Sequence, residues 1–342
     1  YFPLWAKTSI AHKLLAAGTS ALSSRPFSVI AHRSAAFQRR VTETLKSAAF
    51  DIVHVDTLAL APFVDRSVPT PTVLTHHNIE SMLMGRRAQV ETRPVLKRLL
   101  ARESAKLATA EREMSPQFDM NIVMSEADQQ VLAGLAPGVR SAVVPNGVDT
   151  GYFQPDPSQE TPALIYTGGM NMFANRDAVM HFLADIWPLI RARNADVVFY
   201  AVGQDPPKEL QAIAEADPRV VVTGYVDDIR PYVRKASVYV VPLRVGGGTR
   251  LKVLDAMAMG KAMVSTSIGC EGIDATPGTH LMIADQPEAF AETTLALLSN
   301  PARRLELSRA ARARVEERYA WPGVGRLLFD AYQGAVEARR RR

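Results

Sequence analysis

Short runs of apolar residues alternate along this chain with longer segments in which apolar residues recur every three or four positions. The short runs have no polar alternation, which is typical of strands buried on both faces of a parallel sheet. The longer segments have the period of helices with one apolar face. This alternation predicts an α/β protein with helices on both faces of parallel sheets. The expected strands are 51–55, 71–75, 120–124, 142–144, 164–167, 197–202, 220–222, 238–243 and 263–265, and the expected helices are 4–22, 34–48, 82–113 with a break near Pro94, 126–135, 175–193, 249–260, 288–298, 302–317 and 322–338.

The alternation is interrupted once, near the middle of the chain. A polar, proline-rich stretch from Pro155 to Pro162 predicts a linker between two domains, and 342 residues are enough for two. We therefore expect one domain at 1–152, a second at 153–320, and a final helix with a basic tail at 321–342.

Composition narrows the class of protein. Hydrophobic residues make up 47% and charged residues 22%, as in a packed globular protein, and no apolar run is long enough to cross a bilayer. The single cysteine, Cys270, excludes an internal disulfide and suits a reducing cytosol. The net charge of +5 comes partly from Arg339 to Arg342, most simply a solvated tail, with anionic lipid or nucleic acid as other contacts. We expect a cytoplasmic protein.

The stretch Gly246-Gly247-Gly248 follows an apolar strand and precedes a helix expected to begin near Thr249, its N-cap. Adjacent glycines let the backbone approach a ligand, and free N–H groups at a helix start attract anions. Arg250 and Lys252 add full positive charge, and Asp255 can accept hydrogen bonds from ribose hydroxyls. The segment predicts a site for a diphosphate and a sugar ring. The alternatives are a simple tight turn and a surface ion pair between Lys252 and Asp255.

Other candidate groups lie on or near expected strands. His76-His77 and Gly168-Gly169 follow strands, and ligands of parallel sheets bind beyond the carboxyl ends of strands. His77 is alternatively a structural histidine, in which case His76 takes its role. His54, inside a strand, is more typical of a core residue than of chemistry. Asp227-Asp228 resembles a metal-binding pair but better fits a helix start.

Several motifs together point to a known family. They are Pro145-Asn146-Gly147-Val148-Asp149 with Phe153, the segment from Gly246 to Gly260, and Val264-Ser265-Thr266. In these motifs the chain resembles the retaining glycosyltransferases of family 4, which have the GT-B fold of two doubly wound Rossmann-like domains facing across a cleft. The resemblance runs from about Asp51 onward and is strongest to bacterial sugar transferases of exopolysaccharide systems, which share segments like 77–81 and 246–252.

The resemblance implies a reaction and its partners. A sugar is transferred from a nucleotide-diphosphate sugar to a glycan or lipid-linked acceptor, with retained anomeric configuration, in exopolysaccharide or cell-surface glycan synthesis. No metal ion or other cofactor is required, because the nucleotide sugar is a co-substrate. The second domain binds the donor and the first the acceptor, to which the C-terminal helix returns. We further expect peripheral contact with the inner face of the plasma membrane and no nucleic-acid partner.

Individual site residues follow from the family's motifs. Asp255 matches the second glutamate of a Glu-x7-Glu motif, which holds ribose, but is one methylene shorter. Gly247 stands at the first glutamate, and 168–171 replaces the usual arginine and lysine, so Arg250 and Lys252 are the candidates for the diphosphate. The expected catalytic residue is His77, and the expected donor site is Gly168, Gly169, Gly246, Gly247, Gly248, Thr249, Arg250, Lys252, Asp255, Glu271 and Gly272.

Two features leave other functions open. Family members begin with a strand, a glycine-rich loop and a helix, and the residues before Asp51 lack this pattern, which predicts an N-terminally incomplete first domain and poor sugar transfer. The missing first glutamate fits a non-catalytic nucleotide-sugar-binding protein. An isomerase similar to nucleotide-sugar 2-epimerases is a further alternative, against which the segment 247–252 argues. A dinucleotide oxidoreductase is least favoured, because no Gly-x-Gly-x-x-Gly follows an early strand.

Overall fold

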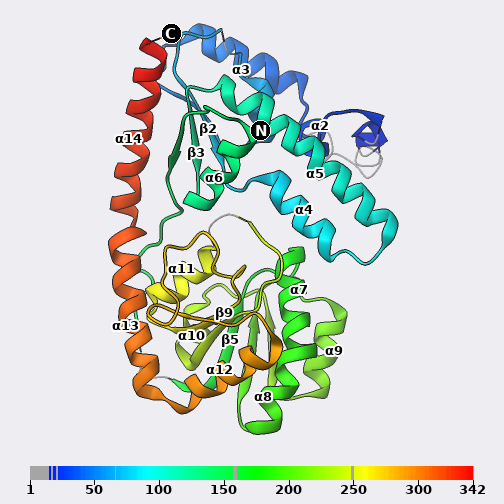
Figure 1. Ribbon diagram of the computed structural model, residues 1–342, viewed down its shortest axis with the longest axis vertical. Coiled ribbons are helices and arrows are strands. Elements are labelled where there is room, and N and C mark those ends of the chain that lie inside the picture. The colour runs from blue at the N-terminus through cyan, green and yellow to red at the C-terminus, as the bar shows by residue number, and fades with distance from the viewer. Residues whose placement is uncertain are drawn as a thin grey trace. The chain divides into compact units, whose positions relative to one another are not determined.

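The computed structural model describes residues 15–16, 18–20, 22–65, 67–156, 160–247 and 250–341, and the chain divides into two compact units (Figure 1). Unit 1 comprises Tyr1–Pro145 and Gly325–Arg342, and unit 2 comprises Asn146–Val324. These divisions differ by a few residues from the expected 152/153 and 320/321. The reason is a β-bridge between Val148 and Ala320, in which the Val148 N–H donates to the Tyr319 carbonyl at 2.8 Å, so both connecting segments belong to unit 2.

The described part of unit 1 contains a four-stranded parallel sheet in the order β1-β2-β3-β4. Strand β2 is buried at every position, as its continuous apolar pattern predicts. The strands are β1 Val53–Val55, β2 Thr72–His76, β3 Met120–Val123 and β4 Ser141–Val143, and the helical segments are α2 Phe27–Ala31, α3 Ala35–Ser47, the 3₁₀ turn η2 Leu58–Phe63, α4 Glu80–Val90, α5 Pro94–Met114, the 3₁₀ turn η3 Ser115–Gln117 and α6 Glu126–Leu135.

Local chemistry explains where several of these helices begin. Ser34 and Ser125 cap α3 and α6, each accepting a backbone N–H three residues on. The expected helix 82–113 is two helices, because Pro94 lies in the first turn of α5, where its missing N–H costs no hydrogen bond. The expected helix 4–22 falls mostly outside the described residues.

The described part of unit 2 contains a six-stranded parallel sheet in the order β10-β9-β8-β5-β6-β7. Helices α8 and α12 contact each other on one face, and α11 and α13 contact each other on the other, so the sheet is doubly wound (Figure 1). The strands are β5 Thr161–Thr167, β6 Val198–Val202, β7 Val220–Gly224, β8 Ala236–Val241, β9 Ala262–Ser265 and β10 Met282–Ile283, and the helices are α7 Phe173–His181, the π turn η5 Phe182–Ile186, α8 Trp187–Arg193, α9 Lys208–Ala216, α10 Arg230–Lys235, α11 Leu251–Ala258, α12 Pro287–Ser299, α13 Pro301–Arg318 and α14 Trp321–Arg340.

The expected linker is wrong. Pro162 lies inside β5, at the point where the pairing with β8 shifts between Thr161 and Leu164, so its missing N–H is tolerated. The Pro155 ring packs against the backbone of Gly260 within unit 2. Pro157 and Ser158 lie outside the described residues. A proline-rich stretch therefore marks an internal loop of unit 2 rather than the boundary between the units.

Helix α11 begins later than expected. Its first residue is Leu251 and its N-cap position is Arg250, whereas the expected N-cap, Thr249, is outside the described residues. The helix ends at Ala258, and Gly260 has a φ of +62°, the left-handed conformation that a glycine permits after a helix. Across the described residues, the helices are too short or too polar to span a bilayer.

Candidate functional site

The loops after β5 and β6 are pressed together at the carboxyl edge of the unit 2 sheet. The Gly168 N–H donates to the Val202 carbonyl at 2.9 Å. A Cβ on Gly203 would overlap the Gly168 carbonyl, and Gly168 and Gly203 have φ of +151° and +158°. Glycine is therefore required at 203 for these loops to meet.

Lys252 of α11 reaches this pair of loops. Its ammonium donates to Asn175 Oδ1 at 2.6 Å and to the Tyr166 hydroxyl at 2.7 Å, and it lies 4.1 Å from the centre of the Tyr166 ring. Asn175 in turn donates to the Gly169 carbonyl at 2.8 Å. A Cβ on Gly168 would lie 2.6 Å from the lysine nitrogen. The structure thus brings Lys252 together with Gly168 and Gly169, two groups of the expected donor site.

The ammonium of Lys252 has no counter-ion among the residues that the structure describes. Burial lowers the pKa of this lysine to about 7, and the charge of Arg250 acts in the same direction. Its hydrogen-bond partners among the described residues are a phenol and an amide, not a carboxylate. A buried cation held by neutral groups gains free energy when an anion arrives, so this position favours a phosphate-bearing ligand.

Arg250 differs from Lys252 in its hydrogen-bond partners. Its side chain is 7% exposed and donates to the carbonyls of Gly247 and, at 3.2 Å, Ile268. Glu271 lies 4.0 Å from the guanidinium. Arg250 therefore ties the glycine loop to the loop that carries Glu271 and Gly272, whose φ is +78°. Its contact with a diphosphate stays a prediction, and Gly248 and Thr249, also expected here, lie outside the described residues.

Asp255 lies in the second turn of α11. Its carboxyl is partly buried and makes no hydrogen bond or ion pair with any residue that the structure describes. Burial raises the pKa of Asp255 to about 7. The charge of Asp255 adds to burial in raising the pKa of Tyr239, whose hydroxyl is paired with Thr167 Oγ1 at 2.5 Å. Both oxygens of Asp255 thus remain available to accept hydrogen bonds from ligand hydroxyls.

His77 belongs to unit 1, where it follows β2. Its Nε2 lies 3.0 Å from Asp56 Oδ1, beyond the end of the neighbouring strand β1, and the two side chains are 46% and 75% exposed. His76 is buried, its Nε2 lies 3.1 Å from Asn121 Oδ1, and burial lowers its pKa to about 4. His76 is therefore held neutral inside the unit, and His77 is the histidine that faces solvent.

The structure also describes His54 and the acidic pair Asp227-Asp228, the other candidates from the sequence. His54 is not a core residue: it is exposed, and its ring nitrogens lie 2.7 Å from the Tyr332 hydroxyl and 2.6 Å from Thr75 Oγ1. Asp228 accepts the backbone N–H of Arg230 at 2.9 Å and pairs with its guanidinium, so this acidic pair marks the start of α10.

The sequence analysis missed three groups. Tyr166 and Asn175, which hold Lys252, look like a strand core residue and a helix surface residue. Asp56 was passed over, although it directly follows a strand whose parallel neighbour ends at His76-His77. That adjacency was the available signal, because carboxyl ends of neighbouring parallel strands meet at one edge.

Comparison with known proteins agrees with this architecture. Residues 18–152 match the family described as Glycosyltransferase Family 4, and residues 161–300 match the family described as Glycosyl transferases group 1. Each half of the chain thus matches a glycosyltransferase domain model, and its two parallel-sheet units are those of the GT-B fold. The two matches meet near the boundary between the units and leave out the final helices of the chain.

Solved structures of other proteins share this fold. Sucrose-phosphate synthase from Thermosynechococcus elongatus has a TM-score of 0.72 at 17% identity, over 88% of this chain and 78% of that chain. HepE from Anabaena, in complex with UDP and glucose, has a TM-score of 0.66 at 14% identity, over 87% and 81%. At the sequence level, an uncharacterized 44.6 kDa protein in the cps region of Klebsiella pneumoniae is 24% identical over 163 residues. The match covers 46% of this chain and 42% of that relative. The chain therefore aligns with less than half of the relative's length.

Proposed function

We propose that this protein transfers a sugar from a nucleotide-diphosphate sugar to a glycan or lipid-linked acceptor, with retained anomeric configuration and without a metal ion. The observation that carries the proposal is Lys252, a buried ammonium beside a glycine loop and without a counter-ion among the described residues. The family matches of both halves support the same class of reaction.

In this proposal unit 2 binds the donor. Negative charge grows on the leaving diphosphate as the glycosidic bond breaks, and Lys252 with the N–H groups of the loop at Gly168-Gly169 stabilises that charge. Asp255 accepts hydrogen bonds from the ribose hydroxyls. Arg250 keeps the glycine loop in place and adds to the positive potential at Lys252.

His77 is the proposed catalytic residue. It stands at a strand end, and Asp56 accepts from its ring and so fixes the ring's orientation. Family resemblance supports a place for His77 beside the donor sugar. The acceptor then attacks on the face from which the diphosphate leaves, because the sequence provides no clear carboxylate nucleophile for a covalent intermediate.

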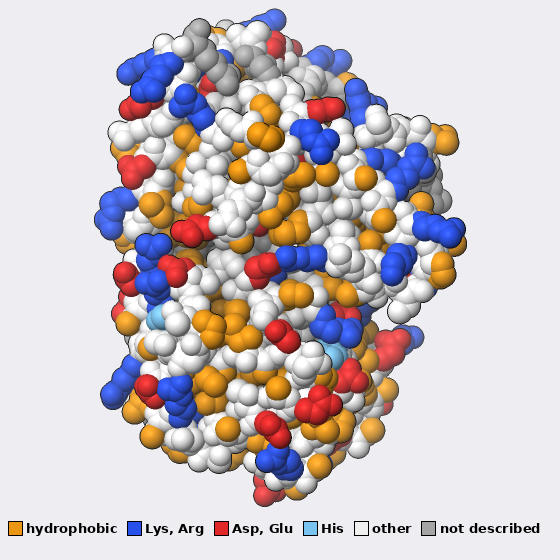
Figure 2. Space-filling model, in the orientation of Figure 1, with side chains coloured by type: hydrophobic (Ala, Val, Ile, Leu, Met, Phe, Trp, Pro, Cys, Tyr) orange, Lys and Arg blue, Asp and Glu red, His pale blue; other side chains and the backbone are white. Residues whose placement is uncertain are grey.

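A place at the cytoplasmic membrane in exopolysaccharide or cell-surface glycan synthesis is part of the proposal. The relative from a cps region supports that pathway class. The hairpin of α4 and α5 exposes Val90, Val95 and Leu99 beside cations such as Lys97 and Arg98. Figure 2 shows Lys and Arg side chains together with hydrophobic ones at the right of the view, where Figure 1 places α4 and α5. Such a surface suits peripheral contact with anionic lipid.

The first test is donor binding followed by turnover. A panel of nucleotide sugars is screened by thermal shift, since a ligand that binds the folded chain raises the melting temperature. The best donor is then incubated with glycan and lipid-linked acceptors, with and without EDTA, and the product's anomeric configuration is read by NMR. We expect a product of retained configuration in both samples. Inverted product, or activity abolished by EDTA and restored by a divalent metal, would contradict the proposed mechanism.

A variant pair separates binding from chemistry. His77→Ala is expected to keep donor affinity and to lose transfer by about 10²-fold or more. His181→Ala is the matched control in unit 2, because this half-buried histidine at the end of α7 pairs with Asp185 of η5, outside the proposed site, and its loss is expected to leave transfer unchanged. Donor binding without any product would favour the nucleotide-sugar-binding protein, and a changed sugar without an acceptor product would favour the 2-epimerase-like isomerase.

A further inference from the structure

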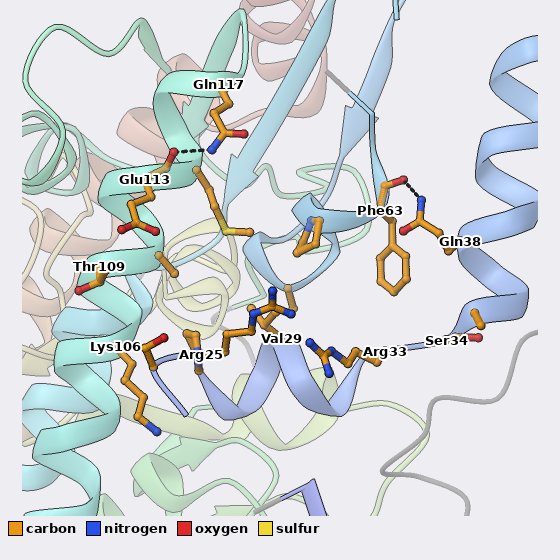
Figure 3. Close-up of a pocket in the computed structure, with 17 residues that line it drawn as sticks. Arg25, Val29, Arg33, Ser34, Gln38, Phe63, Lys106, Thr109, Glu113 and Gln117 are labelled. Atoms are coloured by element: carbon orange, nitrogen blue, oxygen red, sulfur yellow. Dashed lines mark hydrogen bonds between the residues drawn. The ribbon is translucent and has the colours of Figure 1, made fainter. Parts of the chain in front are cut away.

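A cavity of about 750 Å³ lies within unit 1, between α2, α3, η2 and α5 (Figure 3). One wall is apolar and includes Val29, Pro62, Phe63 and Met114. The volume is in the range of pockets that take small organic ligands. The donor site of unit 2 contributes no residue to it, so it is a separate feature of the molecule.

Two arginines carry positive charge into this cavity. The side chains of Arg25 and Arg33 extend toward one another across it, from the two ends of α2 (Figure 3). Neither guanidinium makes a hydrogen bond or ion pair with any residue in the part of the chain that the structure describes. Glu113 also borders the cavity but pairs with neither of them. Both residues are exposed, so their donors are hydrated in the free chain and open to an anionic ligand that enters the cavity.

A nearby lysine shows what a satisfied cation looks like in the same wall. Lys106 is 9% exposed, its ammonium donates to the Ser20 carbonyl and to Ser20 Oγ at 3.2 Å, and it lies 3.6 Å from Glu103. Its charge is therefore compensated within the protein. Arg25 and Arg33 differ because their planar donor forks are left for a ligand.

We propose that this cavity binds an amphiphilic organic phosphate, whose phosphoryl group lies between Arg25 and Arg33 and whose apolar part lies against the wall formed by Val29, Phe63 and Met114. Guanidinium pairs recognise phosphoryl oxygens in two-pronged hydrogen bonds, and the apolar wall excludes water from an attached chain. The ligand is a soluble alkyl phosphate or the headgroup region of a phospholipid. This site lies beyond the proposed transfer reaction and does not depend on it.

The test is calorimetric titration of the whole chain with inorganic phosphate, butyl phosphate and octyl phosphate below its micellar concentration, and with octyl glucoside as a neutral probe. We expect one site, with affinity rising by up to about fourfold for each methylene that is buried. Octyl glucoside is expected to bind far more weakly than octyl phosphate. Equal binding of the two octyl probes, or of inorganic and octyl phosphate, would overturn the proposal.

The variant R25A/R33A is expected to weaken octyl phosphate binding by about tenfold or more, since each lost charged hydrogen bond has an effect of this size. The matched control is R39A/R40A, which removes two exposed arginines of α3 that do not line the cavity. Equal losses in the two variants would show that binding is general surface attraction. Far-ultraviolet circular dichroism and a cooperative thermal melt like that of the parent chain report that both variants remain folded.

Vesicles of phosphatidylcholine with and without phosphatidic acid distinguish the two sources of the phosphate. Binding to phosphatidic acid vesicles that R25A/R33A abolishes and R39A/R40A leaves in place identifies a lipid headgroup. Binding of octyl phosphate monomers without arginine-dependent vesicle binding identifies a soluble ligand. Arginine-independent vesicle binding together with no monomer binding would refute the cavity as the site.

Discussion

Two lysines at opposite ends of α11 hold their ammonium groups inside unit 2, and their hydrogen-bond partners differ in charge. Lys252, at the first turn, donates to Tyr166 and Asn175, which are neutral. Lys261, just after the helix, is 1% exposed, pairs with Glu160 at 2.9 Å and donates to the carbonyls of Arg234 and Ala236. Burial lowers the pKa of both, but the charge of Glu160 opposes the shift at Lys261.

The difference separates a structural cation from a ligand-binding one. The partners of Lys261 compensate its charge inside the protein, so it joins β5, β8 and the start of β9. Lys252 has hydrogen bonds but no compensating charge among the described residues. Its charged form is therefore not fully stabilised until an anion binds. We therefore expect the loss of Lys261 to lower stability, and the loss of Lys252 to weaken ligand binding.

The largest expected effect is on stability at Lys261. Lys261→Met leaves the carbonyls of Arg234 and Ala236 without this donor and leaves Glu160 with Arg304, 3.6 Å away, as its remaining cation. We expect the free energy of unfolding to fall by about 3 kcal/mol. Denaturant unfolding followed by circular dichroism measures this. Lys235→Met is the control, because Lys235 is exposed at the end of α10. A loss below ~1 kcal/mol would mean that the ion pair contributes little and that the contrast between the lysines is overstated.

The corresponding change at Lys252 is expected to spare stability and to damage binding. Lys252→Met should weaken the best nucleoside diphosphate by about 10- to 100-fold, while the parent nucleoside is nearly unaffected, because the diphosphate alone loses a charged donor. The free energy of unfolding should stay equal or rise, since a costly buried charge is removed. Calorimetry with both ligands decides, and equal weakening of the two would contradict a diphosphate role.

Asp255 offers a smaller effect at the other end of the ligand. Asp255→Asn keeps the shape of the side chain and removes the charge, so we expect nucleoside and nucleoside diphosphate to weaken together, by ~1.5 kcal/mol. Asp274→Asn is a control at an ion pair with Arg314 on the surface of unit 2. Unchanged affinity in Asp255→Asn would remove ribose recognition from this residue.

The smallest expected effect is a pH dependence of the free chain. The raised pKa of Asp255 gives stability that is present below its ordinary value of 3.8 and is lost as pH rises through about 7. The lowered pKa of Lys252 gives stability that is present above its ordinary value of 10.5 and is lost as pH falls through about 7. The two together predict a shallow stability minimum near pH 7. Unfolding from pH 5 to 9 should show that minimum in the parent chain and not in the double variant Lys252→Met, Asp255→Asn.

The sequence predicted the sheets well because buried parallel strands have a pattern that is short, apolar and unbroken. Strands such as β3 and β8 were located to within about two residues for this reason. It failed where a residue's meaning depends on a partner far along the chain. Pro162, expected in a linker, lies inside β5, where a shift in the pairing with β8 tolerates its missing N–H.

In the candidate site, the sequence led to Lys252 and Asp255 because the order of strand, glycine loop and helix is local. Their binding roles stay predictions. The buried position of the Arg250 side chain could not be predicted, because it depends on a hydrogen bond to the carbonyl of Ile268, 18 residues away. Asn175 and Tyr166 were missed for the same reason, because their hydrogen bonds to Lys252 join residues that are far apart in the sequence.

The β-bridge between Val148 and Ala320 has a consequence for how such chains can be recombined. It holds the entry and the exit of unit 2 side by side, and the Trp321 ring packs so closely on Gly147 that a Cβ there would lie 2.6 Å from it. A module whose two ends meet can be moved into another host chain with little closure entropy. Residues 146–324 therefore form a natural cassette, and exchange of this cassette between relatives is a route by which one unit 1 can acquire a new unit 2.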